Sequence, residues 1–128
     1  MIVEDEGDLS DALARRFARR GFFVLETASP LVAIQHLRDK KADLVICDIN
    51  LKVELSGLDV FHTMKAENLT VPFVFFTGHG EGTKEVQTAL EAGADGVFSK
   101  PTDFPVLLQK VCVLLGLASD AVSLAHLK

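Results

Sequence analysis

Short apolar runs alternate with longer segments of helical period along the chain, and this alternation constrains the fold more than any other feature. The runs 44–47 and 73–76 are rich in β-forming residues and lack polar alternation, which is typical of parallel strands covered on both faces. Three shorter runs, at 1–3, 22–25 and 96–99, are also largely apolar. The pattern therefore predicts five strands.

The segments between these runs carry the signals of helix ends. Ser29 followed by Pro30 is typical of an N-cap and a first helical position, and Gly21 and Gly93 are expected to end helices. Five strands alternating with five helices imply right-handed crossovers and one parallel sheet with helices on both faces. We therefore predict an α/β fold of the flavodoxin-like type, a (βα)5 doubly wound sandwich with strand order 2-1-3-4-5.

The size of the chain fits one domain. It has 128 residues, of which 48% are hydrophobic, so it is long and apolar enough to bury a single core. We assign residues 1–117 to this domain. Residues 118–128 are assigned to a C-terminal tail, and Leu117, Ala121 and Leu124 recur at helical spacing from the end of the domain into this tail.

Charge and cysteine content exclude several classes of protein. The 13 Lys and Arg against 18 Asp and Glu give a net charge of -5, the wrong sign for a general nucleic-acid binder. The two cysteines, Cys47 and Cys112, lie in apolar runs and form neither a disulfide framework nor a metal-ligand spacing, which favours a reducing, cytoplasmic setting. No apolar run has the length needed to span a bilayer, so no membrane partner is expected.

Polar residues cluster where the predicted strands end, and the important ones are Glu4, Asp5, Asp48, Asn50, Thr77 and Lys100. Ligands of open α/β sheets bind outside the carboxyl ends of the strands. Crowded carboxylates repel one another unless a cation lies between them, and hard oxygen ligands suit Mg²⁺, or Mn²⁺ in its place. With a phosphoryl group present, the metal and Lys100 would neutralise its oxygens and Thr77 would donate a hydrogen bond. Asp48, at the centre of the sheet, would then be the nucleophile.

Each of these residues alone has an ordinary structural explanation. Acidic residues after a strand favour the first turn of a helix, a single lysine is usually a surface residue, and a threonine is usually a local cap. The placement of Asp48, Thr77 and Lys100 at successive strand ends favours the functional interpretation over these three separate ones.

The order of these motifs resembles that of the receiver domains of two-component response regulators, including the single-domain chemotaxis type. The resemblance spans almost the whole chain. It rests on Glu4-Asp5, on Asp48 within Val45-Ile46-Cys47-Asp48-Ile49-Asn50, on Thr77-Gly78, on Gly93-Ala94-Asp95 and on Lys100-Pro101.

The resemblance implies a phosphoacceptor switch that catalyses only its own phosphorylation and dephosphorylation. Asp48 would accept the phosphoryl group of a sensor histidine kinase or a histidine phosphotransfer protein. Asp5 and Asp48 would ligate Mg²⁺ directly, Glu4 through water and Asn50 through its main-chain carbonyl. Thr77 and Lys100 would contact the phosphoryl oxygens.

Three further residues occupy positions that modulate the switch in this family. His79 stands where, together with Asn50, the family tunes phosphate lifetime. Val97 replaces the Tyr or Phe that usually rotates inward on activation. Pro101 follows Lys100 in a peptide that is typically cis, which shapes the loop carrying the lysine.

The last predicted helix, 105–115, carries more apolar residues than burial on one face requires. One explanation is a broad core contact. Our hypothesis is a surface formed with the segments 85–92 and 96–99, which binds a downstream protein or a second copy of the chain. If the chain is complete, its output acts through such a partner; if it is an excised domain, an output domain follows residue 128.

Two other classes of function remain as alternatives. A receiver-like module that interacts without phosphorylation is compatible with Val97, although Asp5, Asp48, Thr77 and Lys100 argue against it. A flavin-binding electron carrier of similar architecture would need aromatic side chains around an isoalloxazine ring, and the chain has no Trp or Tyr.

Overall fold

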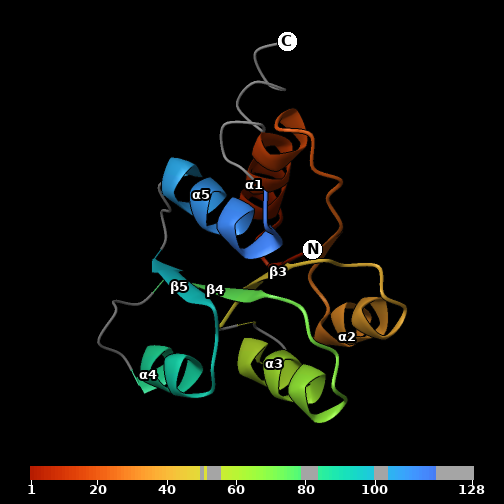
Figure 1. Cartoon of the computed structure of the whole chain (residues 1–128), viewed down its shortest axis with the longest axis vertical. Coiled ribbons are helices and arrows are strands. Elements are labelled where there is room, and N and C mark those ends of the chain that lie inside the picture. Colours follow the sequence, from red (N-terminus) through yellow and green to blue (C-terminus); the bar gives the residue numbers. More distant parts are fainter. Residues whose placement is uncertain (50, 52–55, 79–83, 100–103, 118–128) are drawn as a thin grey trace.

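The computed structural model describes residues 1–49, 51, 56–78, 84–99 and 104–117. It contains a five-stranded parallel sheet with the order β2-β1-β3-β4-β5, as the sequence predicted (Figure 1). The strands are β1 (Ile2–Val3), β2 (Glu26–Thr27), β3 (Val45–Asp48), β4 (Phe73–Thr77) and β5 (Gly96–Ser99).

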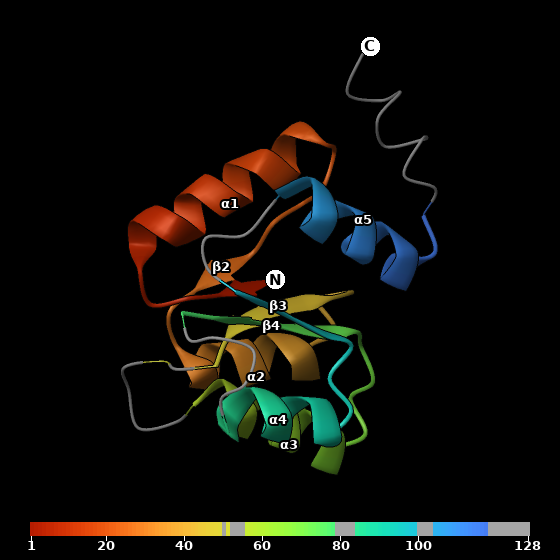
Figure 2. The same cartoon turned by 90° about the vertical axis from the view of Figure 1, so that its left-hand side faces the viewer.

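Five helices cover the two faces of this sheet. They are α1 (Gly7–Arg19), α2 (Pro30–Arg38), α3 (Gly57–Ala66), α4 (Lys84–Glu91) and α5 (Phe104–Leu115). Helices α1 and α5 lie on one face, and α2, α3 and α4 lie on the other (Figure 2). This is the doubly wound, flavodoxin-like arrangement. Among the described residues, no helix combines the length and the apolar character that a membrane crossing requires.

The ends of α1 and α2 are fixed by capping residues that are recognisable in the sequence. The hydroxyl of Ser29 accepts a hydrogen bond from the amide of Val32 at 3.2 Å, and Pro30 is the first residue of α2. Beyond the C-cap of α1, Gly21 adopts a φ of 91°, a left-handed conformation that only glycine reaches without strain. These signals place α1 and α2 as predicted.

Two hydrophobic clusters lie on opposite faces of the sheet. The cluster beneath α2, α3 and α4 contains the rings of Phe61, Phe73 and Phe75, which pack with centroids 4.9–5.6 Å apart. The cluster beneath α1 and α5 contains Phe17 and Phe104, with centroids 5.0 Å apart. Strands β3 and β4 are buried along their whole length because both faces are covered, as the absence of alternation predicted.

The second strand is the one substantial correction. The sequence predicted it at 22–25, whereas β2 comprises Glu26 and Thr27. Strand pairing begins at Ile2, opposite Glu26, and Leu25 contributes only its carbonyl to the amide of Ile2, so residues 22–24 have no described strand beside them. Instead, the ring of Phe22 packs edge-on against Phe17 at 5.4 Å, and the run serves as a wall of the α1 cluster.

The other boundaries differ from the predictions by single residues. Helices α4 and α5 each begin one residue earlier, and β3 and β4 each extend one residue further, to Asp48 and Thr77. The extension has a functional consequence, because both polar residues are held in the sheet ladder and not in a loop.

Candidate functional site

The strand register brings the predicted site residues to one edge of the sheet. Val3 pairs with Cys47, which places Glu4 beside Asp48 at the ends of adjacent strands. Asp48 pairs with Phe76, so Thr77 lies one residue further along the neighbouring strand. Neighbouring strands are separated by about 4.8 Å, so these side chains share a small volume at the carboxyl edge.

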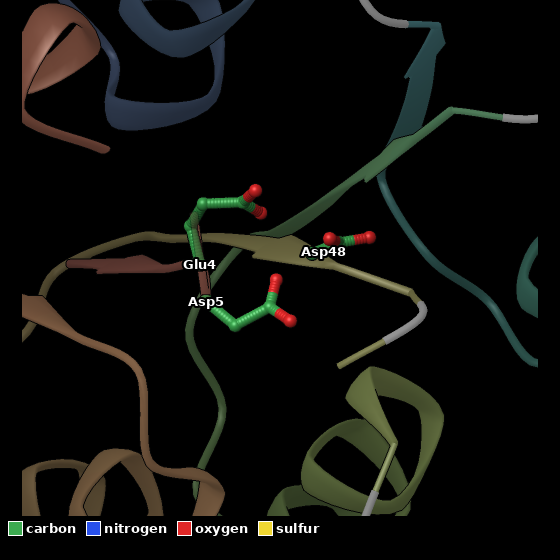
Figure 3. Close-up of side chains that lie close together, drawn as sticks. All are labelled: Glu4, Asp5 and Asp48. Carbon is green, nitrogen blue, oxygen red and sulfur yellow. The ribbon is translucent and has the colours of Figure 1, made fainter. Parts of the chain in front are cut away.

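Three carboxylates meet at this edge (Figure 3). Glu4, Asp5 and Asp48 each contribute one oxygen to a group whose members all lie within 4.8 Å of one another. Glu4 and Asp48 are only 3% and 5% exposed, while Asp5 is partly exposed. The amide of Glu4 donates to the carbonyl of Thr27 at 3.0 Å, which fixes the backbone at the two acidic residues that follow β1.

This cluster has the chemistry of a site for a hard divalent cation. Three carboxylates in so small a space repel one another, and a cation between them removes that repulsion. Carboxylate oxygens are the ligands that Mg²⁺ prefers, and a cluster open on one side leaves positions for water or a phosphoryl oxygen. The residues present therefore fit a magnesium ion.

Cys47 precedes Asp48 on β3, and the pKa of its thiol responds to the negative charge of the carboxylates. Its thiol is fully buried, and Sγ donates to the carbonyl oxygen of Asp48 at 3.3 Å. Burial raises the pKa of this thiol well above its usual range, and the nearby charges of Asp48 and Glu4 raise it further. The thiol is therefore an uncharged packing group within the buried strand β3.

Gly57, at the start of α3, packs against the backbone of Asp48. A Cβ atom at Gly57 would overlap the carbonyl oxygen of Asp48, and the Gly57 amide donates to the carbonyl of Ile49 at 3.0 Å. A capping box between Ser56 and Asp59 begins α3 at this point. The start of α3 is thus packed directly onto the segment that carries the central aspartate.

Sequence reasoning did not assign this positioning role to Gly57, although the signal was present. A serine three residues before an acidic residue, at the start of an apolar helical pattern, predicts a capping box and hence the first turn of α3. The close approach of glycine to the Asp48 carbonyl depends on tertiary packing that no local pattern encodes.

Thr77 and Val97 occupy neighbouring strands. Thr77 is completely buried as the last residue of β4, beside Ser99 of β5. Val97 pairs with Phe75 and packs against the α2–α4 cluster, whereas Phe98 packs against the α1–α5 cluster. These two β5 side chains therefore face opposite sides of the sheet.

Four residues of the predicted site lie outside the described residues. They are Asn50, His79, Lys100 and Pro101. The structure therefore brings together Glu4, Asp5 and Asp48 and places Thr77 at the same edge, while the roles assigned to the other four stay predictions.

Comparison with known proteins points to one family. The family model described as the response regulator receiver domain matches residues 1–112. A curated relative, Response regulator SaeR of Staphylococcus aureus strain USA300, is 35% identical over 103 residues, which cover 79% of this chain and 43% of the relative. The chain thus spans less than half the length of this relative.

Solved structures share the fold. The receiver domain of the Francisella response regulator 1452 superposes with a TM-score of 0.82 at 16% identity, covering 90% of this chain and 93% of that one. A DNA-binding response regulator of the LuxR family from Staphylococcus aureus has a TM-score of 0.79 at 20% identity, covering 89% and 95%. From the family match, the carboxylate cluster and the strand order, we conclude that the chain belongs to the receiver domains of two-component response regulators.

Proposed function

We propose that this receiver domain is a phosphoacceptor switch in which Asp48 receives a phosphoryl group from a phosphohistidine. The observation that carries the proposal is the meeting of Glu4, Asp5 and Asp48, with Asp48 on the central strand. A carboxylate oxygen of Asp48 forms the new bond to phosphorus as the bond from phosphorus to the histidine nitrogen breaks. The donor is a sensor histidine kinase or a histidine phosphotransfer protein.

The residues at the carboxyl edge of the sheet have different roles in binding the phosphoryl group. Glu4, Asp5 and Asp48, with the main-chain carbonyl of Asn50, would hold Mg²⁺, which when bound supplies positive charge to the phosphoryl oxygens. The hydroxyl of Thr77 donates a hydrogen bond to one of those oxygens. The ammonium group of Lys100 neutralises another.

The lifetime of the phosphorylated state is set at the rim of this site. Water hydrolyses the acyl phosphate, and His79 and Asn50 control its approach. Pro101 shapes the loop that carries Lys100. Because the domain catalyses only its own phosphorylation and dephosphorylation, it acts as a switch, and its output is a shift between conformational populations.

The output of the switch acts through other proteins. Large apolar side chains are exposed on α4 and α5, notably Leu90, Val106 and Val113. Exposed apolar patches mark interaction surfaces, so we assign the surface of α4, β5 and α5 to a downstream protein or to self-association. No direct contact with nucleic acid or membrane is part of this proposal.

The same proposal covers the domain limits and the cellular setting. Residues 1–117 form the receiver domain, since α5 ends at Leu115 and Gly116 follows with a left-handed φ of 72°. Residues 118–128 are the tail. The two buried, unpaired cysteines, Cys47 and Cys112, favour the reducing cytoplasm.

Phosphorylation by a small-molecule donor tests the function directly. The chain is incubated with acetyl phosphate, with and without Mg²⁺, and its intact mass is compared with that of Asp48→Asn. We expect a Mg²⁺-dependent gain of one phosphoryl group in the unchanged chain and none in the variant. A folded chain that gains no phosphoryl group, under conditions that label an established receiver domain, contradicts the proposal.

A second candidate is a receiver-like module that binds its partner without phosphorylation. The observation that favours it is Val97 on β5, where no aromatic ring is available to rotate. The two candidates differ in one measurement, because phosphorylation of Asp48 changes partner affinity in the first and leaves it unchanged in the second.

A further inference from the structure

Strand β2 forms one edge of the sheet, since β1 is the only strand that pairs with it among the described residues. The carbonyls of Leu25 and Thr27 accept hydrogen bonds from the amides of Ile2 and Glu4, at 2.8 and 3.0 Å. Backbone groups of successive strand residues point in opposite directions, so the N–H and C=O of Glu26 point away from β1, toward the open edge. An open strand edge is a template for pairing with another chain.

A groove runs beside this edge, between α1 and the segment that leads into β2. Its volume is about 480 Å³, and Ala14 and Ala18 of α1 lie on one side with Phe23 and Val24 on the other. Two alanines one helical turn apart leave space above the helix that bulkier residues would fill. The groove is open to solvent and has room for a side chain of the size of phenylalanine.

Phe23 is the most exposed large apolar side chain among the described residues, with 91% of its surface accessible. Its neighbour Phe22 is packed against Phe17, so the exposure of Phe23 is not shared by the whole apolar run. Phe23 stands at the rim of a groove able to accept such a ring, which makes this surface complementary to itself. Self-complementary surfaces are what a two-fold symmetric dimer requires.

The charges around the groove are also complementary to themselves. Arg15, Asp11 and Glu26 all line it, so both signs of charge are present. Oε1 of Glu26 accepts a hydrogen bond from the hydroxyl of Ser10 at 2.8 Å, which fixes the carboxylate beside the groove. In a two-fold dimer, an arginine of one copy can therefore pair with an acidic group of the other.

We propose that two copies of this chain associate through the α1–β2 groove, defined as the surface of residues 11–18 and 22–26. Phe23 of each copy enters the groove of the other, and Arg15 of one copy faces Glu26 of the second. The segment 22–24 also borders the end of α5, since Phe23 shares a second cavity with Val111 and Leu115, but the exposed α5 residues Val106 and Val113 line neither that cavity nor the α1–β2 groove. The association does not depend on phosphorylation of Asp48.

Sedimentation velocity from micromolar to near-millimolar concentration tests the proposal. We expect a concentration-dependent shift from monomer to dimer without acetyl phosphate. Phe23→Ser is expected to raise the dimer Kd at least ~10-fold, because it removes a large apolar contact from each copy. Leu31→Ser on α2, which changes another exposed large apolar residue, is expected to leave the dimer intact, and Val113→Ser on α5 distinguishes this dimer from self-association through α5.

Charge exchange provides the second arm. Arg15→Glu and Glu26→Arg should each weaken the dimer, and the double variant should restore it, because only reciprocal pairing survives the exchange. Ser10→Ala, which removes the Glu26 hydrogen bond without changing charge, separates the loss of that bond from the loss of charge pairing. Circular dichroism confirms that each variant is folded.

Three outcomes would overturn the proposal. They are a monomer at every concentration, a dimer unaffected by Phe23→Ser, and a dimer abolished by Val113→Ser. The last would assign self-association to the α5 surface.

Discussion

At the scale of single residues, the site is organised by negative charge held at close range. Asp48 and Glu4 are almost fully buried, and Asp5 completes a group whose oxygens lie within 4.8 Å. Burial disfavours charged carboxylates and mutual repulsion adds to that cost, and a cation bound between the three oxygens offsets both. The same arrangement makes the cluster receptive to Mg²⁺, and stability and binding should therefore respond in opposite directions to removal of one carboxylate.

Asp5→Asn tests this opposition. In EDTA, the variant should match or exceed the thermal stability of the unchanged chain, because one repulsive charge is lost. In Mg²⁺, it should bind the ion at least ~10-fold more weakly and lose most of the metal-dependent gain in Tm. Calorimetric titration and thermal unfolding measure the two quantities.

Glu6→Gln is the matched control, since Glu6 is exposed at the start of α1 and lies outside the carboxylate cluster. It should leave Mg²⁺ affinity within about twofold of the unchanged chain. Equal losses of affinity in the two variants would show that general surface charge, and not the cluster, holds the ion.

The buried thiol of Cys47 predicts a loss of stability at alkaline pH. Burial raises its pKa in the folded state, whereas the unfolded chain ionises near the ordinary value of 9.0. The unfolded state therefore releases a proton that the folded state retains, and the free energy of unfolding falls as pH rises above ~9, by up to ~1.4 kcal/mol per pH unit.

Urea unfolding across this pH range measures the slope. Cys47→Ala should flatten it, while Cys112→Ala should retain the share that belongs to Cys47. An unchanged slope in Cys47→Ala would contradict the account. Absolute stability is not the readout, because either substitution also leaves a cavity.

At the scale of elements, the start of α3 is the part that sets the position of Asp48. The capping box of Ser56 and Asp59 fixes the first turn, and Gly57 packs against the carbonyl of Asp48. A Cβ atom there has no flexible side chain to displace, since the obstacle is backbone. Helix α3 and strand β3 must therefore move apart if Gly57 is replaced by a residue with a side chain.

Gly57→Ala is expected to lower the free energy of unfolding by about 2 kcal/mol or more, in the range of overpacked cores. Because strand β3 must shift, Mg²⁺ affinity should fall as well. Gly7→Ala is the matched control: Gly7 begins α1 with open space around its Cβ position, and alanine favours the helix. That variant should be equally or more stable, by up to ~1 kcal/mol. Urea unfolding compares the two, and similar effects would refute the steric argument.

The sequence predicted the position of an element where local signals determine its ends, and failed where the ends depend on pairing with a neighbouring strand. Ser29 with Pro30 placed α2, and the unbroken apolar run of β4 identified a doubly covered strand. The second strand was misplaced because residues 22–25 have strand composition, but β1 begins at Ile2, opposite Glu26, and bonds only to the carbonyl of Leu25 within that run. At the site, strand ends indicated Glu4, Asp5, Asp48 and Thr77, since parallel strands share one carboxyl edge. The approach of Gly57 to Asp48 required the tertiary structure.

At the scale of the whole molecule, one sheet joins two hydrophobic clusters. Strands β3 and β4 contribute side chains to both, with Phe73 and Phe75 on one face and Val74 and Phe76 on the other. Neither cluster can lose its packing without disturbing a strand that the other needs. We therefore expect the domain to unfold in one cooperative transition.

Amide hydrogen exchange tests this cooperativity. The amides of β3 and β4 should exchange most slowly, at the rate set by global unfolding, and those of the edge strand β2 should exchange faster. Phe17→Ala in the α1–α5 cluster should cost about 3–5 kcal/mol and speed the exchange of β3 and β4 as strongly as Phe61→Ala in the α2–α4 cluster. Both rings are almost fully buried, so the substitutions are comparable. If Phe17→Ala accelerated exchange only in α1, α5 and β2, the two faces would be independent units. A structural change at Asp48 would then not be transmitted from one face of the sheet to the other.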